Sequence, residues 1–215
     1  MDSINVHSIF PTLYITAEWE DQKKHKQDLL DFCYKYEKTY PHKDRSIFEG
    51  QPHQEAFEGE YNYYGSLLAN EPENLFEYDE LKPLLTFITT KLKDVNSKMN
   101  FKEDHKWNIT HSWLNINRKY SMHRAHSHGH SVWSGIYYLK TNQNSAPLVF
   151  TNALGEYRQH WPHDITPIEP CEFTSSQQIV YPQEGQLILF PGYLIHSVPQ
   201  HLDDEDRVNI AFNIS

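Results

Sequence analysis

The chain has 215 residues, of which 38% are hydrophobic and 14% aromatic, and its 29 acidic and 19 basic side chains give a formal net charge of −10. This composition is that of a globular protein, and it excludes a disordered or a fibrous chain. The acidic balance argues against nucleic acid or an anionic membrane as the main partner.

The first half of the chain predicts one strand and two helices. Residues 9–15 form an apolar patch that indicates an opening strand at a sheet edge. Apolar residues then recur with helical spacing from about residue 18 to 40, and again from about 79 to 99, where Pro83 falls in the permissive first turn. The segment 41–74 is polar, aromatic and irregular. We expect both helices to pack against a sheet.

After Lys106 the period of the apolar residues changes from that of a helix to that of a strand. Strands are predicted at residues 111–118, 133–139, 148–152, 177–181, 186–190 and 208–214. The segments between them hold no helical pattern long enough for parallel crossovers. The second half is therefore predicted to be an antiparallel sandwich or barrel.

The two cysteines, Cys33 and Cys171, lie far apart in the sequence, which is not a disulfide framework. The first residues lack a basic segment followed by an apolar one, and no run approaches 18 apolar residues. We therefore expect a protein of a reducing compartment, the cytoplasm.

Three of the 14 histidines have a spacing that suits a metal site. His126 and His128 are one residue apart, so on an extended chain both imidazoles project from one face and can share an ion. His196 follows a strongly apolar strand and is the third candidate. We expect His130, which follows a glycine, and His123, which falls on the opposite face, to lie outside the ligand set or in solvent.

The last predicted strand has one apolar and one polar face. Val208, Ile210, Phe212 and Ile214 alternate with Arg207, Asn209, Ala211 and Asn213. The polar face begins with an arginine, eleven residues after His196. We expect Arg207 to have a functional role.

These residues, in their order along the chain, resemble the Fe(II)- and 2-oxoglutarate-dependent oxygenases. The features that carry the resemblance are His126, His128, the stretch 134–139, Gly185, Phe190, Pro191, His196 and Arg207. The pattern is most similar to the small oxygenases of bacteria and phages, and it covers residues 107–215. The resemblance implies a mainly β fold, a double-stranded β-helix or jelly-roll barrel, buttressed by two α-helices from the first half. The chain would then be one oxygenase domain, with residues 1–106 as helical support and edge strand.

The resemblance further implies that His126, His128 and His196 bind Fe(II). Most members of the superfamily have an acidic residue two positions after the first histidine, and here that position is His128. The usual two-His, one-carboxylate set leaves three open positions for 2-oxoglutarate and O₂. Three neutral histidines leave the site one charge unit more positive, which favours the dianionic cosubstrate.

Four further residues match positions that hold 2-oxoglutarate in this superfamily. Arg207 would pair with the distal carboxylate, because a guanidinium fork matches a carboxylate bidentately. Tyr138 corresponds to a tyrosine that bonds the same carboxylate in the prolyl-hydroxylase-like branch. Asn115 and Asn209 match asparagines that touch the cosubstrate in the alkyl-lesion demethylase branch. The expected activity is oxidation, most often hydroxylation, of a small-molecule or peptide substrate.

Two other functions remain open at this point. Three histidines with an open fourth position also suit a zinc hydratase or hydrolase, where Arg207 and Tyr138 have no evident purpose. A cupin-like barrel that binds without catalysis is the other, although Val132 and Trp133 stand where a cupin motif needs Glu. We expect the segment 152–172 to meet the substrate or to cover the barrel, through Tyr157, Arg158, His160 and Trp161.

Overall fold

The computed structural model describes residues 12–40, 62–65, 74–102, 104–152, 171 and 175–215. The helices in these ranges are α1 (Gln22–Thr39), the short 3₁₀ helices η2 (Leu75–Glu77) and η3 (Asp79–Leu81), and α3 (Lys82–Lys98). The strands are β1 (Ile15–Glu18), β2 (Asn62–Gly65), β3 (Ile109–Asn117), β4 (His123–His126), β5 (Trp133–Lys140), β6 (Leu148–Thr151), β7 (Gln177–Val180), β8 (Gln186–Pro191), β9 (His196–Val198) and β10 (Arg207–Ile214).

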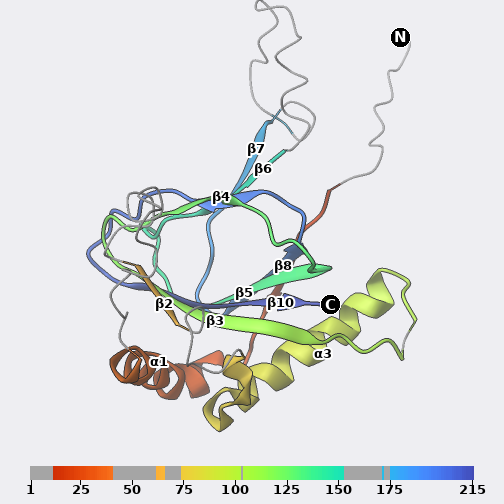
Figure 1. Cartoon of the computed structure of the whole chain (residues 1–215), viewed down its shortest axis with the longest axis horizontal. Helices are drawn as coiled ribbons and strands as arrows, with labels where there is room; N and C mark the ends of the chain where they lie inside the picture. The colour runs from red at the N-terminus through yellow and green to blue at the C-terminus, as the bar shows by residue number, and fades with distance from the viewer. Residues whose placement is uncertain (1–11, 41–61, 66–73, 103, 153–170, 172–174) are drawn as a thin grey trace, which may run out of the picture.

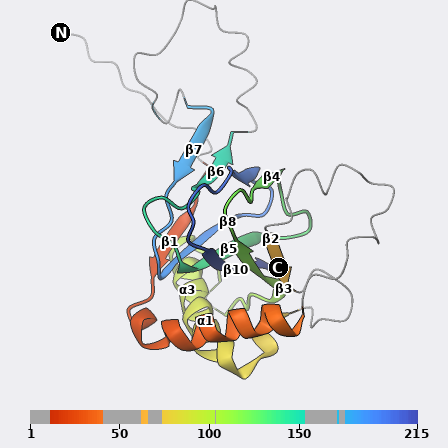
Figure 2. The same cartoon turned by 90° about the vertical axis from the view of Figure 1, so that its left-hand side faces the viewer.

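The strands form two antiparallel sheets that enclose the interior of a barrel. The larger sheet has the order β1-β8-β5-β10-β3-β2, and the smaller one has the order β4-β9-β6-β7. Figure 1 shows α1 and α3 on the outer side of the larger sheet, away from β4, and the turned view in Figure 2 agrees. This is the predicted jelly-roll barrel with two buttressing helices.

The two helices and the outer face of the larger sheet share the main hydrophobic core. Its members include Leu29, Phe32, Cys33 and Tyr36 of α1, Leu84, Ile88, Leu92 and Val95 of α3, and Leu114, Ile116, Val208, Ile210, Phe212 and Ile214 of the sheet. Each helix contributes residues three or four positions apart, so it buries a single stripe. That stripe is the pattern from which both helices were predicted.

Both helices begin later than predicted. Residues 15–18 pair with β8 as strand β1, so α1 starts only at Gln22. Residues 79–81 form η3, and α3 follows with Pro83 in its first turn. The opening strand was also misplaced, because β1 starts at Ile15 and residues 9–11 lie outside the described part of the chain.

All six strands predicted in the second half form, and their ends shift by at most two residues. The structure adds three short strands that were not predicted as such, namely β2, β4 and β9. They have four, four and three residues, too few for an alternating pattern to stand out. Two of these short strands, β4 and β9, carry candidate metal ligands.

Strands β3 and β10 turn their polar faces towards the barrel interior, as their alternation predicts. They are paired so that Arg207 lies opposite Asn117, and Asn209 opposite Asn115. Beside these polar residues is a second apolar cluster, which includes Ile136, Tyr138, Leu148, Phe150, Phe190 and Ala211. The barrel interior is thus part apolar and part polar, unlike the outer core.

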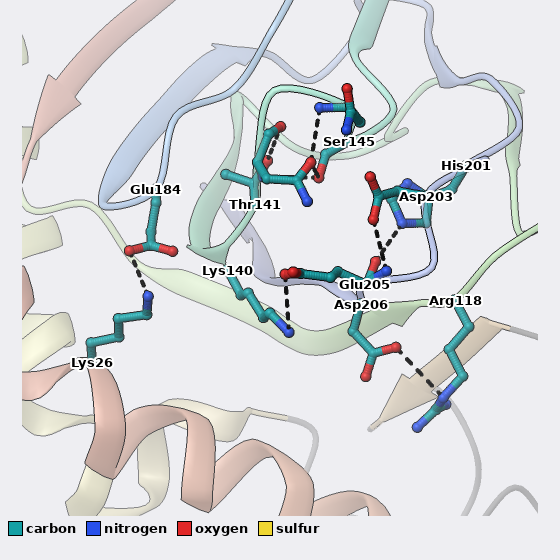
Figure 3. A network of polar contacts seen from close by, with 12 residues as sticks. Lys26, Arg118, Lys140, Thr141, Ser145, Glu184, His201, Asp203, Glu205 and Asp206 are labelled. Atoms are coloured by element: carbon teal, nitrogen blue, oxygen red, sulfur yellow. Dashed lines mark hydrogen bonds and ion pairs between the residues drawn. The ribbon is translucent and has the colours of Figure 1, made fainter.

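Ion pairs hold the connection between β9 and β10 on the outside of the barrel. Figure 3 shows Lys140 with Glu205 and Arg118 with Asp206, and also the pair Lys26–Glu184 that ties α1 to the turn before β8. Lys119 adds a contact of 2.7 Å to Asp204. In the acidic run 203–206, Asp204, Glu205 and Asp206 therefore each have a cationic partner on the outside of the barrel.

Cys33 is buried in the main core and Cys171 is exposed, and no disulfide joins them. Burial raises the pKa of the Cys33 thiol well above its usual range. Among the described residues, no helix is long and apolar enough to cross a membrane.

Candidate metal centre

The three candidate metal ligands come from two neighbouring strands and the loop that follows one of them. His126 ends β4 and His196 begins β9, and these two residues are direct partners in the β4–β9 pairing. His128 lies two residues beyond β4, where its backbone N–H donates to the Gly192 carbonyl at 2.7 Å. Gly192 in turn donates to the Val132 carbonyl, at 3.1 Å. These bonds fold the loop after β4 against the turn after β8.

The three imidazoles converge as ligands of one ion would. One nitrogen from each of His126, His128 and His196 lies within 4.8 Å of the other two. The Nε2 atoms of His128 and His196 are 3.3 Å apart. Two nitrogens that each lie about 2.1 Å from a shared ion, in tetrahedral or octahedral geometry, are about 3.0–3.4 Å apart. The spacing therefore fits a common ion with little movement of either ring.

Hydrogen bonds orient two of these rings for metal binding. The Nδ1 atom of His126 lies 2.7 Å from the Arg124 carbonyl, and Nδ1 of His196 lies 2.9 Å from the Leu194 carbonyl. A carbonyl accepts only, so Nδ1 carries the proton and Nε2 keeps a free lone pair. Each of these rings therefore presents Nε2 as its ligand atom.

Burial keeps two of the histidines in the neutral form that a metal requires. Removal from water, helped by the nearby His126, lowers the pKa of His196 to about 3. The same two causes lower the pKa of His128 to about 4. Both rings are consequently uncharged at neutral pH, and metal binding there displaces no proton from them.

A cavity runs from these histidines into the barrel. It holds about 430 Å³ of empty space, part of it open to solvent. Its lining comprises Trp113, Asn115, His123, His126, His128, Gly135, Ile136, Leu148, Phe190, His196, Val198, Arg207, Asn209 and Ala211. His126 is exposed whereas Arg207 is 1% exposed, so the cavity deepens from the candidate metal site to the arginine.

Arg207 lies at the buried end, between strands β3 and β5. Its Nη1 donates to Asn117 Oδ1 at 2.6 Å, and its Nη2 donates to the Tyr138 hydroxyl at 3.2 Å. The guanidinium carbon also lies 5.0 Å from the centre of the Tyr138 ring. Both of these contacts are with neutral groups, which orient a guanidinium without cancelling its charge.

The two predicted asparagines lie side by side in the wall of the cavity. Asn115 Nδ2 donates to Asn209 Oδ1 at 2.8 Å. Asn115 is 4% exposed, and its Oδ1 has no hydrogen-bond partner within the described part of the chain. A buried polar atom of this kind in a cavity wall usually meets a ligand or water. Asn115 Oδ1 can accept a hydrogen bond from water or from a donor group of a ligand, whereas the imidazoles suit a metal and Arg207 suits an anion beside it.

His123 was predicted to face away from the candidate ligands, and this prediction was wrong. Its ring lines the same cavity, because the β4–β9 pairing shifts register between His123 and His126 and so breaks the alternation. His130 is exposed, as predicted. Sequence reasoning assigned no role to Asn117, although it shares a strand face with Asn115. The segment 152–172, with its four expected rim residues, lies almost wholly outside the described residues.

Residues 111–213 match the model of a family described as "Putative 2OG-Fe(II) oxygenase". Among solved structures, a Pseudomonas putida prolyl-4-hydroxylase superposes with a TM-score of 0.60 at 10% identity, over 95% of this chain and 94% of that one. HygX from Streptomyces hygroscopicus, with nickel, 2-oxoglutarate and hygromycin B bound, gives 0.59 at 12% identity over 95% and 83%. The comparison with curated proteins found no match.

The structural likeness supports the double-stranded β-helix fold over nearly the whole chain, and the family match covers the strands that carry the candidate site. Members of this family are oxidoreductases that use Fe(II) and 2-oxoglutarate. Residues 111–213, which contain the candidate site, thus match the family of 2OG-Fe(II) oxygenases.

Proposed function

We propose that this protein is a dioxygenase in which His126, His128 and His196 hold Fe(II). The observation that carries the proposal is the convergence of these imidazoles within 4.8 Å at the mouth of a cavity that ends at a buried arginine. All three protein ligands are then neutral, so the bound ion keeps its full charge of two. This strengthens binding of a dianion compared with a site that contains a carboxylate ligand.

The inner end of the cavity binds 2-oxoglutarate in this proposal. Arg207 pairs with the distal carboxylate, and the Tyr138 hydroxyl, already 3.2 Å from the guanidinium, donates to the same group. Asn115 and Asn209 form the polar wall beside the cosubstrate. When bound, Fe(II) and 2-oxoglutarate supply the oxidising chemistry of the family, in which 2-oxoglutarate and O₂ are converted to succinate and CO₂ while the substrate is oxidised.

The substrate enters from the exposed side of the site, beside His126. Hydroxylation of a small molecule or a peptide is the reaction we propose, supported by two similar structures. One contains hygromycin B, and the other, a prolyl hydroxylase from Trichoplax adhaerens, is in complex with a peptide fragment. We also propose that the whole chain, residues 1–215, acts as one oxygenase domain in which residues 1–106 support the barrel.

The metal part is tested by Fe(II) content after anaerobic loading. The protein should bind one Fe(II) per chain, and His126→Ala, His128→Ala or His196→Ala should each remove most of it. His130→Ala is the matched control, because His130 is exposed in the same loop. Unchanged iron content in His196→Ala would show that the third ligand is assigned wrongly.

The cosubstrate part is tested by calorimetric titration of the Fe(II)-loaded protein with 2-oxoglutarate without oxygen. Arg207→Lys should weaken binding and Arg207→Ala should weaken it more, by about 30-fold or more, since truncating one side of a desolvated charge pair costs about 2–5 kcal/mol. Metal bound without any 2-oxoglutarate affinity would favour a zinc hydrolase, and binding of neither would favour a non-catalytic barrel.

A further inference from the structure

Two hydrogen bonds join Arg207 through Asn117 to His123, and the first and last of these three residues line the cavity. Arg207 Nη1 donates to Asn117 Oδ1 at 2.6 Å, and Asn117 Nδ2 lies 2.8 Å from His123 Nε2. Arg207 and Asn117 are 1% exposed, and His123 lines the cavity. The three residues come from strands β10, β3 and β4, so the relay joins the larger sheet to the smaller one.

The chemistry of the three groups allows only one orientation of this relay. A guanidinium has donors only, so the Asn117 amide must turn its oxygen towards Arg207. Its NH₂ group then points at His123, which must accept at Nε2 and carry its ring proton on Nδ1. Burial and the nearby Arg207 lower the pKa of His123 well below its usual value, in agreement with a neutral ring. If the amide were flipped, its NH₂ group would face the N–H donors of Arg207, and the hydrogen bond between the two residues would be lost.

We infer that Asn117 and His123 are positioning residues for 2-oxoglutarate, which orient the Arg207 guanidinium through a neutral hydrogen-bond relay. The inference rests on the proposed function of Arg207. Asn117 holds one edge of the fork and Tyr138 holds the other, from the strands on either side of β10. His123 acts through Asn117, because its lone pair holds the amide in the orientation that Arg207 needs.

The absence of charge on the Asn117 side chain distinguishes a positioning residue for an anion from an ordinary structural contact. A carboxylate at position 117 would hold the guanidinium at least as firmly as the amide does, because an ion pair replaces a neutral hydrogen bond, and His123 can follow by moving its ring proton to Nε2 and donating to the second carboxylate oxygen. It would also cancel the charge that attracts 2-oxoglutarate and repel the cosubstrate carboxylate. A structural contact tolerates this exchange, whereas a positioning residue for an anion does not.

The deciding experiment compares Asn117→Asp with Asn117→Ala. We expect Asn117→Asp to weaken 2-oxoglutarate binding by at least about 30-fold, with iron content and melting temperature close to those of the unchanged protein. Asn117→Ala should weaken it by about 10-fold through the loss of one oriented hydrogen bond. Anaerobic calorimetry on the Fe(II)-loaded proteins measures both. If Asn117→Asp binds 2-oxoglutarate with unchanged affinity, the inference is overturned.

The second pair of variants tests His123. His123→Gln keeps an acceptor that can meet Asn117 Nδ2, so 2-oxoglutarate affinity should stay within about twofold. His123→Leu removes the acceptor, and we expect a loss of about fivefold. Equal affinities for the two variants would remove His123 from the relay.

Asn96→Ala is the matched control for loss of a buried asparagine. Asn96 is 1% exposed at the end of α3 and makes two hydrogen bonds, to Trp107 and to the His105 carbonyl, far from the cavity lining. This variant should lower the melting temperature and leave 2-oxoglutarate affinity unchanged.

The unchanged protein and Arg207→Ala separate the two proposals. If the unchanged protein binds 2-oxoglutarate and Arg207→Ala does not, while the Asn117 variants bind normally, only the relay is wrong. If the unchanged protein itself shows no binding, the proposed function fails and the relay fails with it.

Discussion

The two faces of strand β10 have opposite chemistry. On the outer face, Val208, Ile210, Phe212 and Ile214 are fully buried in the core shared with the helices. On the inner face, Arg207 and Asn209 are equally buried, yet they line a cavity and bond to polar neighbours. One strand therefore separates folding from ligand binding by the direction in which alternate side chains point.

A second comparison concerns how the two halves of the candidate site are supported. The cosubstrate half is built from strands within one sheet, β3, β5 and β10. The metal half combines two short strands with a loop, and His128 depends on backbone contacts to Gly192. We expect the metal half to be more sensitive to changes in loops than the cosubstrate half is.

The largest effect we expect is on stability, from the outer face of β10. Phe212→Ala should lower the free energy of unfolding by about 3–5 kcal/mol, because it removes a fully buried ring that packs against Phe76. Equilibrium denaturation in urea measures this loss. Asn209→Ala, on the inner face, should cost less than about 2 kcal/mol and weaken 2-oxoglutarate binding. Equal costs for both would contradict the separation of roles.

The next effect is a pH dependence that arises from two of the candidate metal ligands. The pKa values of His196 and His128 lie at about 3 and about 4 in the folded chain, below the usual 6.5. As the pH falls below 6.5, the unfolded chain takes up protons that the folded chain does not, so folding loses stability. We expect the metal-free protein to lose about 2–4 kcal/mol between pH 6.5 and 4.5 through these two groups.

Urea denaturation of chelator-treated protein at several pH values tests this expectation. His196→Gln should flatten the profile, because glutamine does not titrate, and the exposed His130 offers a control in His130→Gln. A profile with the same slope in His196→Gln as in the unchanged protein would show that His196 is not the source of the pH dependence.

A smaller effect is expected in the loop that carries His128. A Cβ at Gly192 would lie 2.3 Å from the Ser131 carbonyl oxygen and 3.0 Å from that of His128, so one backbone segment must move. Gly192→Ala should therefore weaken Fe(II) binding by about 10-fold and lower stability by about 1–2 kcal/mol. Gly129→Ala is the control, since nothing lies within 4 Å of a Cβ there. Similar iron affinities in both variants would contradict this role of Gly192.

The sequence predicted some parts of the fold and of the candidate site better than others. The inward direction of Asn115, Asn209 and Arg207 followed from alternation within single strands, and the period of a regular strand does not depend on distant contacts. The two helices followed in the same way from their apolar stripes. Their first residues were wrong because β1 and η3 depend on pairing and packing with other parts of the chain.

The parts that the sequence did not predict depend on contacts between distant residues. His123 faces the cavity because of a bulge against β9, and alternation within its own segment indicates the opposite face. Asn117 could be placed on the inner face of its strand, but its role needs a partner 90 positions away. The convergence of His126 and His128 was predicted from their spacing, whereas the close approach of Gly192 to their loop was not.

The smallest effect we expect comes from a clamp outside the barrel, at the same strand ends that carry Asn117 and Arg207 inside it. Arg118 forms two contacts with Glu37 of α1, with Nη1 2.7 Å from Oε1 and Nη2 2.9 Å from Oε2. Its Nε lies 3.9 Å from Asp206 Oδ1. Figure 3 draws this contact between Arg118 and Asp206. Because neighbouring residues of a strand point to opposite faces, this clamp fixes the outer side of the strand ends only.

Glu37→Gln tests whether the outer side of these strand ends affects the inner one. The side chains of Arg118 and Glu37 are 39% and 20% exposed, so water and salt screen the pair, and its loss should cost about 0.5–1 kcal/mol. The cost should shrink in high salt, and Lys91→Gln, which removes the exposed pair with Asp94, should cost less. If alternate faces of a strand act independently, 2-oxoglutarate affinity in Glu37→Gln should change by less than about twofold, since no contact of Arg207 is lost. A loss as large as that in Asn117→Ala would instead mean that α1 sets the position of Arg207 through the backbone, and the two faces would then form one coupled unit.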